Sequence, residues 1–328
     1  MASVDVIVPC YQYGHFLRDC AASVLSQDIG DLRLLIIDNA STDNTLEVAA
    51  EIAAADKRVE VIAHRSNLGP LASFNEGIDW ASAPYFIVLC ADDLLAPGAL
   101  GRAASIMEQH PEVVLTYGAA PVIGAEAAVL PSGEEPENAQ WQIYSGNALL
   151  ERFCRTARCD IPGSTVVVRT SAQKQVGYYR TKLPHSCDFE MWMRFACVGS
   201  VAETKTVQAF ARRHAANLSS SITHLAWYSH FDAALESFFA REGASASEMA
   251  GLHRVARRTL GEHAYWSAVA NLVRGQYRLS LALFKFAFMH SPVTAVLPPV
   301  ASLFQRDDAY GRITRVISDA GRRLVIPN

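Results

Sequence analysis

The chain has 328 residues, of which 50% are hydrophobic and 19% are charged. This length is enough for one large or two ordinary domains with a full core. The formal net charge of −4 argues against a molecule that binds polyanions over its whole surface, so we expect no nucleic-acid partner.

The distribution of charge and the cysteines indicate the partner surface and the cellular location to expect. Residues 1–240 hold 17 Lys and Arg against 27 Asp and Glu, whereas residues 241–328 hold 12 against 6. A basic, apolar C-terminal region on an acidic body suggests contact with an anionic surface. The seven cysteines form no Cys-x-x-Cys pair, and the chain enters a strand directly after Ser3. Reduced thiols, no signal peptide and a cytoplasmic location are therefore expected.

Strand-like and helix-like segments alternate along the first part of the chain. Strands are expected at 4–8, 32–37, 59–63, 85–89 and 113–117. Helices are expected at 15–26, between the second and third strands to about residue 55, between the third and fourth strands to about residue 81, and at 99–110. Ser41 or Thr42 can cap the second of these helices. The alternation predicts βαβ units and an α/β fold with a doubly wound, mostly parallel sheet.

The apolar run Tyr85–Leu89 ends in two adjacent carboxylates, Asp92 and Asp93. In open α/β sheets the ligand crevice lies at the carboxyl ends of the strands. Hard oxygen ligands at that edge suit Mg²⁺ or Mn²⁺ carrying a diphosphate. The alternative is that one of the two aspartates caps the helix expected to start near Pro97.

Two other strands end in candidate ligand groups, at Pro9-Cys10-Tyr11 and at Asp38. No Gly-x-Gly-x-x-Gly or Walker loop follows the first strand, which argues against a dinucleotide oxidoreductase and a P-loop NTPase. A nucleotide can still lie across this edge, with its base near Tyr11 and Asp38.

Four blocks, in this order and spacing, carry a resemblance to a known family. They are Val6–Tyr11 with Gln27, Asp38–Thr45, Asn67-Leu68-Gly69, and Ala91-Asp92-Asp93 with Pro97. Together they resemble the family 2 glycosyltransferases of the GT-A fold, over roughly residues 3–118. The resemblance implies a nucleotide-sugar donor, with a UDP-sugar favoured, a divalent metal, Mg²⁺ or Mn²⁺, and inversion at the anomeric carbon.

The resemblance also assigns roles to individual residues. Asp38 is expected at the base, Asp92 at the ribose or the metal, and Asp93 at the metal. The donor-binding set is completed by Pro9, Tyr11 and Asn67. Many members carry Asp-x-Asp-Asp where this chain has Cys90-Ala91-Asp92-Asp93. Cys90 replaces the first aspartate, so fewer carboxylates are available for the metal.

The second part of the chain contains a candidate general base, Asp188. Inverting transfer needs a carboxylate on the acceptor side to take the hydroxyl proton. The segment resembles the family's Glu-Asp-x-x-x-Trp block, with Cys187 in place of the acidic partner. A helix N-cap is the alternative role for Asp188, and Glu190 is the alternative base. Farther on, His214 is a candidate metal or phosphate contact, or else a loop histidine.

From residue 222 onward the pattern is helical. The strongly apolar run 279–304 is interrupted by Lys285, His290 and three prolines, so it is not expected to span a membrane. An interfacial element, a helical cap and a homodimer interface all fit this region.

These observations predict three regions: 1–118 for the nucleotide-sugar, 119–221 for the acceptor, and a helical region at 222–328. The expected function is transfer of a sugar to a glycan or lipid-linked acceptor in cell-surface polysaccharide synthesis. The C-terminal helices are a candidate for peripheral contact with the inner face of the membrane. A nucleotidyltransferase and a non-catalytic glycan- or nucleotide-binding module remain alternatives.

Overall fold

The structure, a computed structural model, describes residues 2–125, 139–183, 185–215, 217, 223–242, 247–304 and 314. The chain divides into two compact units, Met1–Leu150 with Asp160–Ser220, and Glu151–Cys159 with Ser221–Asn328. The acidic stretch 133–137, which its sequence predicts to be a turn, lies outside the described residues. We describe each unit separately.

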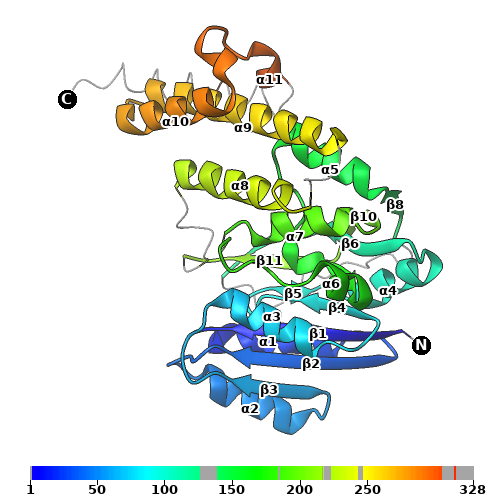
Figure 1. Cartoon of the computed structure of the whole chain (residues 1–328). Helices are drawn as coiled ribbons and strands as arrows, with labels where there is room; N and C mark the ends of the chain where they lie inside the picture. Colours follow the sequence, from blue (N-terminus) through cyan, green and yellow to red (C-terminus); the bar gives the residue numbers. More distant parts are fainter. Residues whose placement is uncertain are drawn as a thin grey trace. The chain divides into compact units, whose positions relative to one another are not determined.

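The first unit is built on an eight-stranded sheet with the order β3-β2-β1-β4-β9-β6-β10-β8 (Figure 1). Its strands are β1 (Ser3–Cys10), β2 (Asp31–Asp38), β3 (Val59–Ala63), β4 (Tyr85–Val88), β6 (Val113–Ala119), β8 (Trp141–Tyr144), β9 (Val167–Arg169) and β10 (Ser200–Val207). Strands β1 to β4 are mutually parallel, whereas β8 and β9 run antiparallel to their neighbours. The mostly parallel α/β fold expected from the sequence is confirmed.

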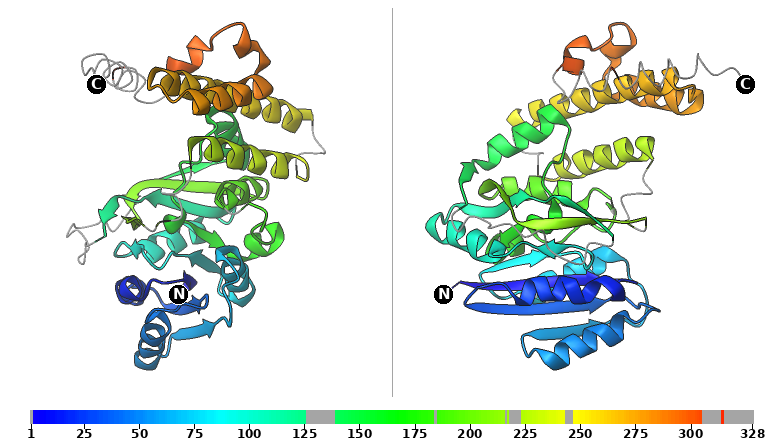
Figure 2. Two further views of the ribbon diagram at one scale, coloured as in Figure 1. Left: turned by 90° about the vertical axis from the view of Figure 1, so that its left-hand side faces the viewer. Right: turned by 180° about the vertical axis from the view of Figure 1, so that it is seen from behind.

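Helices cover both faces of this sheet because alternate residues of each strand point to opposite sides. Val4, Val6 and Val8 of β1 share a core with α1 (Gly14–Leu25), α2 (Thr45–Ala55) and α4 (Ala99–Gln109). Ile7 points to the other face, toward α3 (Pro70–Trp80), where a Cβ on Gly77 would come within 2.5 Å of the Ile7 side chain. The two views in Figure 2, read with Figure 1, show α1 and α3 on opposite faces.

A second, three-stranded sheet lies in the same unit. It has the order β5-β11-β7 and consists of β5 (Leu94–Leu95), β7 (Val122–Gly124) and β11 (Ala209–Arg213). Strand β11 pairs antiparallel with β5 and parallel with β7. Because β5 directly follows the two adjacent aspartates, this pairing brings residues after position 208 next to Asp92 and Asp93.

The second part of this unit adds three helices and a short 3-10 turn, η1 (Gly163–Thr165). The helices are α5 (Gly146–Thr156), whose later residues belong to the second unit, α6 (Thr170–Val176) and α7 (Cys187–Ala196). In α7 the apolar side chains at helical spacing are buried, with Phe189 and Trp192 each 3% exposed. These side chains belong to the core.

The second unit is helical. It contains α8 (His224–Phe239), α9 (Ser247–Val273), α10 (Tyr277–His290), η3 (Pro292–Ala295) and α11 (Val300–Phe304). The C-terminal helical extension predicted from the sequence is therefore present (Figure 1). Among the residues described, no helix combines the length and the apolar character that crossing a bilayer requires.

The caps considered from the sequence for α2 and α4 are wrong. The residue before α2 is Asn44, while the Ser41 and Thr42 hydroxyls accept hydrogen bonds from Gln12 of the preceding loop. Helix α4 begins after Gly98 in a left-handed conformation, so neither Asp92 nor Asp93 caps it. These polar side chains serve contacts between loops, which a local sequence pattern does not reveal.

Candidate active site

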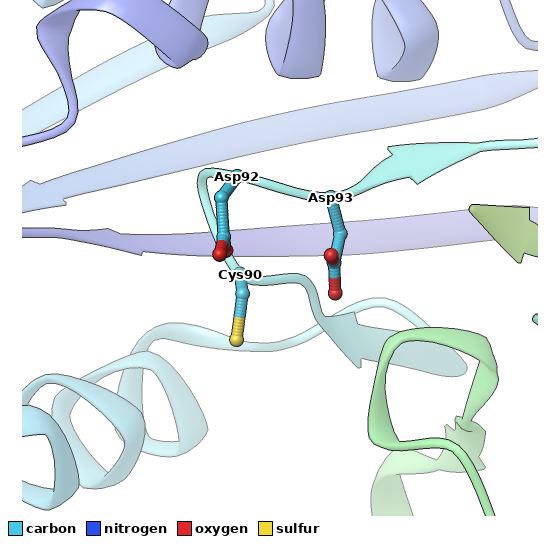
Figure 3. Close-up of side chains that lie close together, drawn as sticks. All are labelled: Cys90, Asp92 and Asp93. Carbon is cyan, nitrogen blue, oxygen red and sulfur yellow. The ribbon is translucent and has the colours of Figure 1, made fainter. Parts of the chain in front are cut away.

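The loop after β4 places Cys90, Asp92 and Asp93 at the carboxyl end of the parallel strands. One ligand atom from each of these residues lies within 4.8 Å of the others. Figure 3 shows the thiol and both carboxylates pointing the same way from this loop. Cys90 is exposed and Asp92 is only 6% exposed. The strand-end cluster predicted from the sequence thus exists as a compact donor set.

The two carboxylates are held by the segment after β11. Asp92 Oδ2 accepts hydrogen bonds from His214 Nε2 at 2.9 Å and from Asn217 Nδ2 at 3.1 Å. Asp93 Oδ1 accepts one from the Arg212 backbone N–H at 2.9 Å, and Arg212 Nε donates to the Asp92 carbonyl at 2.9 Å. His214, predicted as a metal or phosphate contact, therefore lies beside Asp92 and is bonded to it.

The electrostatics of this pair favour a bound cation. Burial, followed by the charge of the neighbouring Asp92, raises the pKa of Asp93 to about 7. Two carboxylates in one partly buried place repel each other, and a divalent cation between them would offset that repulsion. The Ser164 side chain and the Arg212 backbone act in the opposite direction, because they hydrogen-bond to the Asp93 carboxylate.

Asp188 lies close to the same cluster. It is the second residue of α7, after the N-cap Ser186, so the N-cap role considered for it is wrong. A Cβ on Gly163 would lie 3.4 Å from Asp188 Oδ2, and the next residue, Ser164, bonds Asp93. The turn η1 therefore connects Asp188 with the aspartate pair. Burial raises the pKa of Asp188 to about 6.

Glu190, the alternative base, is in a different environment. Its side chain is completely buried and forms ion pairs with Arg194 at 2.9 Å and Arg180 at 2.5 Å. A carboxylate that neutralises two guanidinium groups in the core is a structural residue. Asp188 has no such ion pair among the described contacts, which favours it over Glu190 as the base.

The remaining predicted residues lie at the carboxyl ends of β1 to β3. Cys10, next to Pro9, pairs in register with Asp38 of the neighbouring strand. The Asp38 carboxylate is 2% exposed and accepts hydrogen bonds from the Ser41 N–H at 3.3 Å. Tyr11, in contrast, is 44% exposed. Since β1, β2 and β4 are adjacent and parallel, Asp38 and the Asp92–Asp93 pair share one edge of the sheet.

Sequence reasoning missed a polar network at this edge. Asn39 Oδ1 accepts hydrogen bonds from the Leu68 N–H at 2.9 Å and contacts His64 Nδ1 at 2.9 Å. Asn39 Nδ2 donates to Asn67 Oδ1 at 3.0 Å, and His64 Nε2 contacts Glu76 at 2.6 Å. Asn67 is thus fixed by Asn39. The available signal was that Asn39 and Asn67 belong to two of the four blocks that carry the family resemblance.

The family model for glycosyl transferase family 2 matches residues 5–175, which is more than half of the chain. The chain belongs to glycosyl transferase family 2. An uncharacterized glycosyltransferase of Haemophilus influenzae is 24% identical over 225 residues, covering 67% of this chain and 68% of that protein. A PGL/p-HBAD biosynthesis glycosyltransferase of Mycobacterium tuberculosis is 33% identical over 116 residues, covering 35% of this chain and less than half, 45%, of that protein.

Solved structures resemble this family 2 glycosyltransferase in fold. The S. aureus TarS fragment 1–349 in complex with UDP-GlcNAc has a TM-score of 0.65 at 17% identity, covering 97% of this chain and 89% of that one. The Pyrobaculum calidifontis mannosyltransferase PcManGT, in complex with GDP-Man and Mn²⁺, has a TM-score of 0.56 at 17% identity, covering 98% and 87%. The GT-A fold and the enzyme class expected from the sequence are confirmed.

Proposed function

We propose that this family 2 glycosyltransferase transfers a sugar, with inversion, from a nucleoside diphosphate donor to a hydroxyl of a glycan or lipid-linked acceptor in cell-surface polysaccharide synthesis. One observation carries the proposal. The Asp92–Asp93 pair and Asp188 face a common edge of one unit, connected through Gly163 and Ser164. An acidic pair for the diphosphate and a separate carboxylate for the acceptor are the two parts that inverting transfer needs.

The donor set of Cys90, Asp92 and Asp93 fits a divalent cation, Mg²⁺ or Mn²⁺. Carboxylate oxygens are hard ligands, and the raised pKa of Asp93 reflects a repulsion that a cation would relieve. When bound, the metal neutralises the charge that develops on the diphosphate leaving group. Asp93 and Asp92 would hold it, while His214 orients Asp92 through their hydrogen bond.

The nucleotide would lie along the ends of β1 to β3. Asp38 is the candidate contact to the base, and Pro9, Tyr11 and Asn67 line the same edge. Structural neighbours solved with UDP-GlcNAc and with GDP-Man support a nucleotide-sugar donor, and we favour a UDP-sugar. The family membership favours sugar transfer over nucleotidyl transfer.

In the chemical step, Asp188 accepts the proton of the acceptor hydroxyl. The acceptor oxygen then forms a bond to the anomeric carbon from the side opposite the diphosphate. The bond between that carbon and the diphosphate oxygen breaks, and its electron pair leaves with the diphosphate. A single displacement of this kind inverts the anomeric configuration.

Two substitutions separate the proposed roles. Asp93→Ala should remove the metal dependence of donor binding, so titration calorimetry with and without Mn²⁺ should give the same weak affinity. Asp188→Asn should retain donor affinity and lose transfer. Metal-dependent binding that survives in Asp93→Ala would refute the metal assignment, and turnover that survives in Asp188→Asn would refute the base assignment.

A further inference from the structure

The surface of α10 in the helical unit carries an exposed apolar stripe. Sixteen large hydrophobic side chains are exposed in the described residues, and ten of them lie between positions 272 and 300. On α10, Tyr277 is 69% exposed, Leu281 73%, Phe288 37% and Met289 57%. At 3.6 residues per turn these positions fall on one face of the helix. The opposite face, with Leu283, Phe286 and Ala287, is buried.

The chain after α10 extends this apolar surface. In η3 and the segment that follows it, Val293 is 66% exposed, Val296 82%, Leu297 65% and Val300 54%. Contiguous apolar surface of this kind on a folded chain marks a site of interaction. We call the residues Tyr277, Leu281, Phe288, Met289, Val293, Val296, Leu297 and Val300 the apolar face.

The charged side chains on the outward side of α10 are both positive. Arg278 and Lys285 are exposed on the outward side of α10, between the apolar residues. From His263 to Arg306 the sequence contains no Asp or Glu. A two-fold contact with a second copy would place these cations near their own equivalents, with no carboxylate in the face to compensate them. A partner surface that carries negative charge above an apolar layer would match both the cations and the apolar side chains.

We propose that the apolar face is a membrane-docking surface. It would bind a bilayer that contains anionic phospholipids, with the axis of α10 parallel to the membrane surface. A helix with apolar residues and Lys or Arg on its outward side binds at the boundary between headgroups and acyl chains. Leu281 and Phe288 enter the apolar layer, while the Arg278 and Lys285 side chains extend to the phosphates. None of the donor-site residues takes part in this contact.

Co-sedimentation of the full chain with vesicles tests the proposal. The chain should pellet with phosphatidylcholine vesicles that contain phosphatidylglycerol and should pellet less with pure phosphatidylcholine. Leu281→Ser and Phe288→Ser should each weaken binding roughly tenfold, because each removes one apolar side chain that would be buried in the bilayer. Arg278→Gln and Lys285→Gln should each weaken it about fivefold, and added salt should mimic them.

Matched substitutions elsewhere serve as controls. Leu46→Ser on α2 removes a leucine that is 42% exposed, and Lys57→Gln removes an exposed lysine, and neither should change vesicle binding. Leu281, Arg278, Lys285, Leu46 and Lys57 are exposed, so circular dichroism should show unchanged melting for variants at these positions, and binding of Phe288→Ser, which also loses a ring contact with Phe284, is measured below its own melting temperature. Equal binding to both vesicle types, or unchanged binding of Leu281→Ser and Phe288→Ser, would overturn the proposal. So would a dimer, measured by light scattering, that these two substitutions dissociate, since the face would then belong to a second copy.

Discussion

At the scale of single residues, the environment of a carboxyl group determines what it can do. Asp93 and Asp188 both have a raised pKa, because each carboxyl is withdrawn from water. Asp93 also has a charged neighbour, Asp92, which points to a cation. The Cys187 thiol lies 3.8 Å from the Asp188 carboxylate. Glu190, in the same helical turn, forms ion pairs with two arginines. Similar aspartates thus receive different proposed tasks.

The pKa of Asp188 predicts the pH dependence of transfer. A base must be deprotonated to accept a proton, so kcat/KM should fall about tenfold per pH unit below pH about 6. Asp188→Asn should lower kcat by roughly 100- to 10,000-fold at neutral pH and abolish this acidic limb. Initial rates from pH 5 to 8, about one unit below and two above that pKa, provide the measurement, and an unchanged limb in the variant would assign it to another group.

The raised pKa of Asp188 also predicts how stability depends on pH. Ionisation of Asp188 supports catalysis but lowers the stability of the folded chain. The folded-state pKa of Asp188 is raised above the value of an unfolded chain, so the folded state gains protons relative to the unfolded one between about pH 4 and 6. Ionisation above that range costs stability. Asp188→Asn should therefore melt at the same or a higher temperature than the parent at pH 7. A lower melting temperature would indicate that Asp188 supports the fold.

At the scale of elements, the sequence predicted what local pattern determines. Strands β1 to β4 are short, largely apolar runs that end at Cys10, Asp38, Ala63 and Val88, and helices α1 to α4 lie where the sequence predicted them. Strand β10, with the sequence SVAETKTV, was missed because more than half of its residues are polar and its partners β6 and β8 are distant in sequence. The β5-β11-β7 sheet, which holds Arg212 and His214 against the aspartates, depends on long-range pairing in the same way.

Helix packing against the sheet can be tested at two glycines of the same unit. A methyl group on Gly77 of α3 would meet the fully buried Ile7 side chain at 2.5 and 2.8 Å, whereas one on Gly101 of α4 would meet only the Asp28 carbonyl, at 3.5 Å. Gly77→Ala should lower the free energy of unfolding by about 2 kcal/mol, because overpacking outweighs the gain in helix propensity. Gly101→Ala should raise it by up to about 1 kcal/mol. Denaturant titration of both variants provides the comparison, and equal effects would contradict the packing argument.

At the scale of the whole molecule, the two units carry separate surfaces. All the predicted donor, metal and base residues lie in the unit Met1–Leu150 with Asp160–Ser220, and the apolar face lies in the unit that contains α8 to α11. The sequence indicated this separation through its charge, which changes from acidic before position 240 to basic after it. Pattern alone could not identify the exposed side of α10, since burial of Leu283 and exposure of Leu281 depend on packing against α9.

This separation predicts where a donor should slow hydrogen exchange in the full chain. A UDP-sugar with Mn²⁺ at about 100 times its Kd should stabilise the folded state by about 2.7 kcal/mol. Protection should appear in peptides that cover the loops after β1, β2 and β4, because the metal and nucleotide would bridge them, and α9 and α10 should exchange as before. Asp93→Ala should show no metal-dependent protection under the same conditions. GDP- and dTDP-sugars compared at equal concentration would reveal which nucleotide base the site prefers. Protection confined to α9 and α10 would contradict the proposal, because the donor would then bind in the unit that does not contain Asp188.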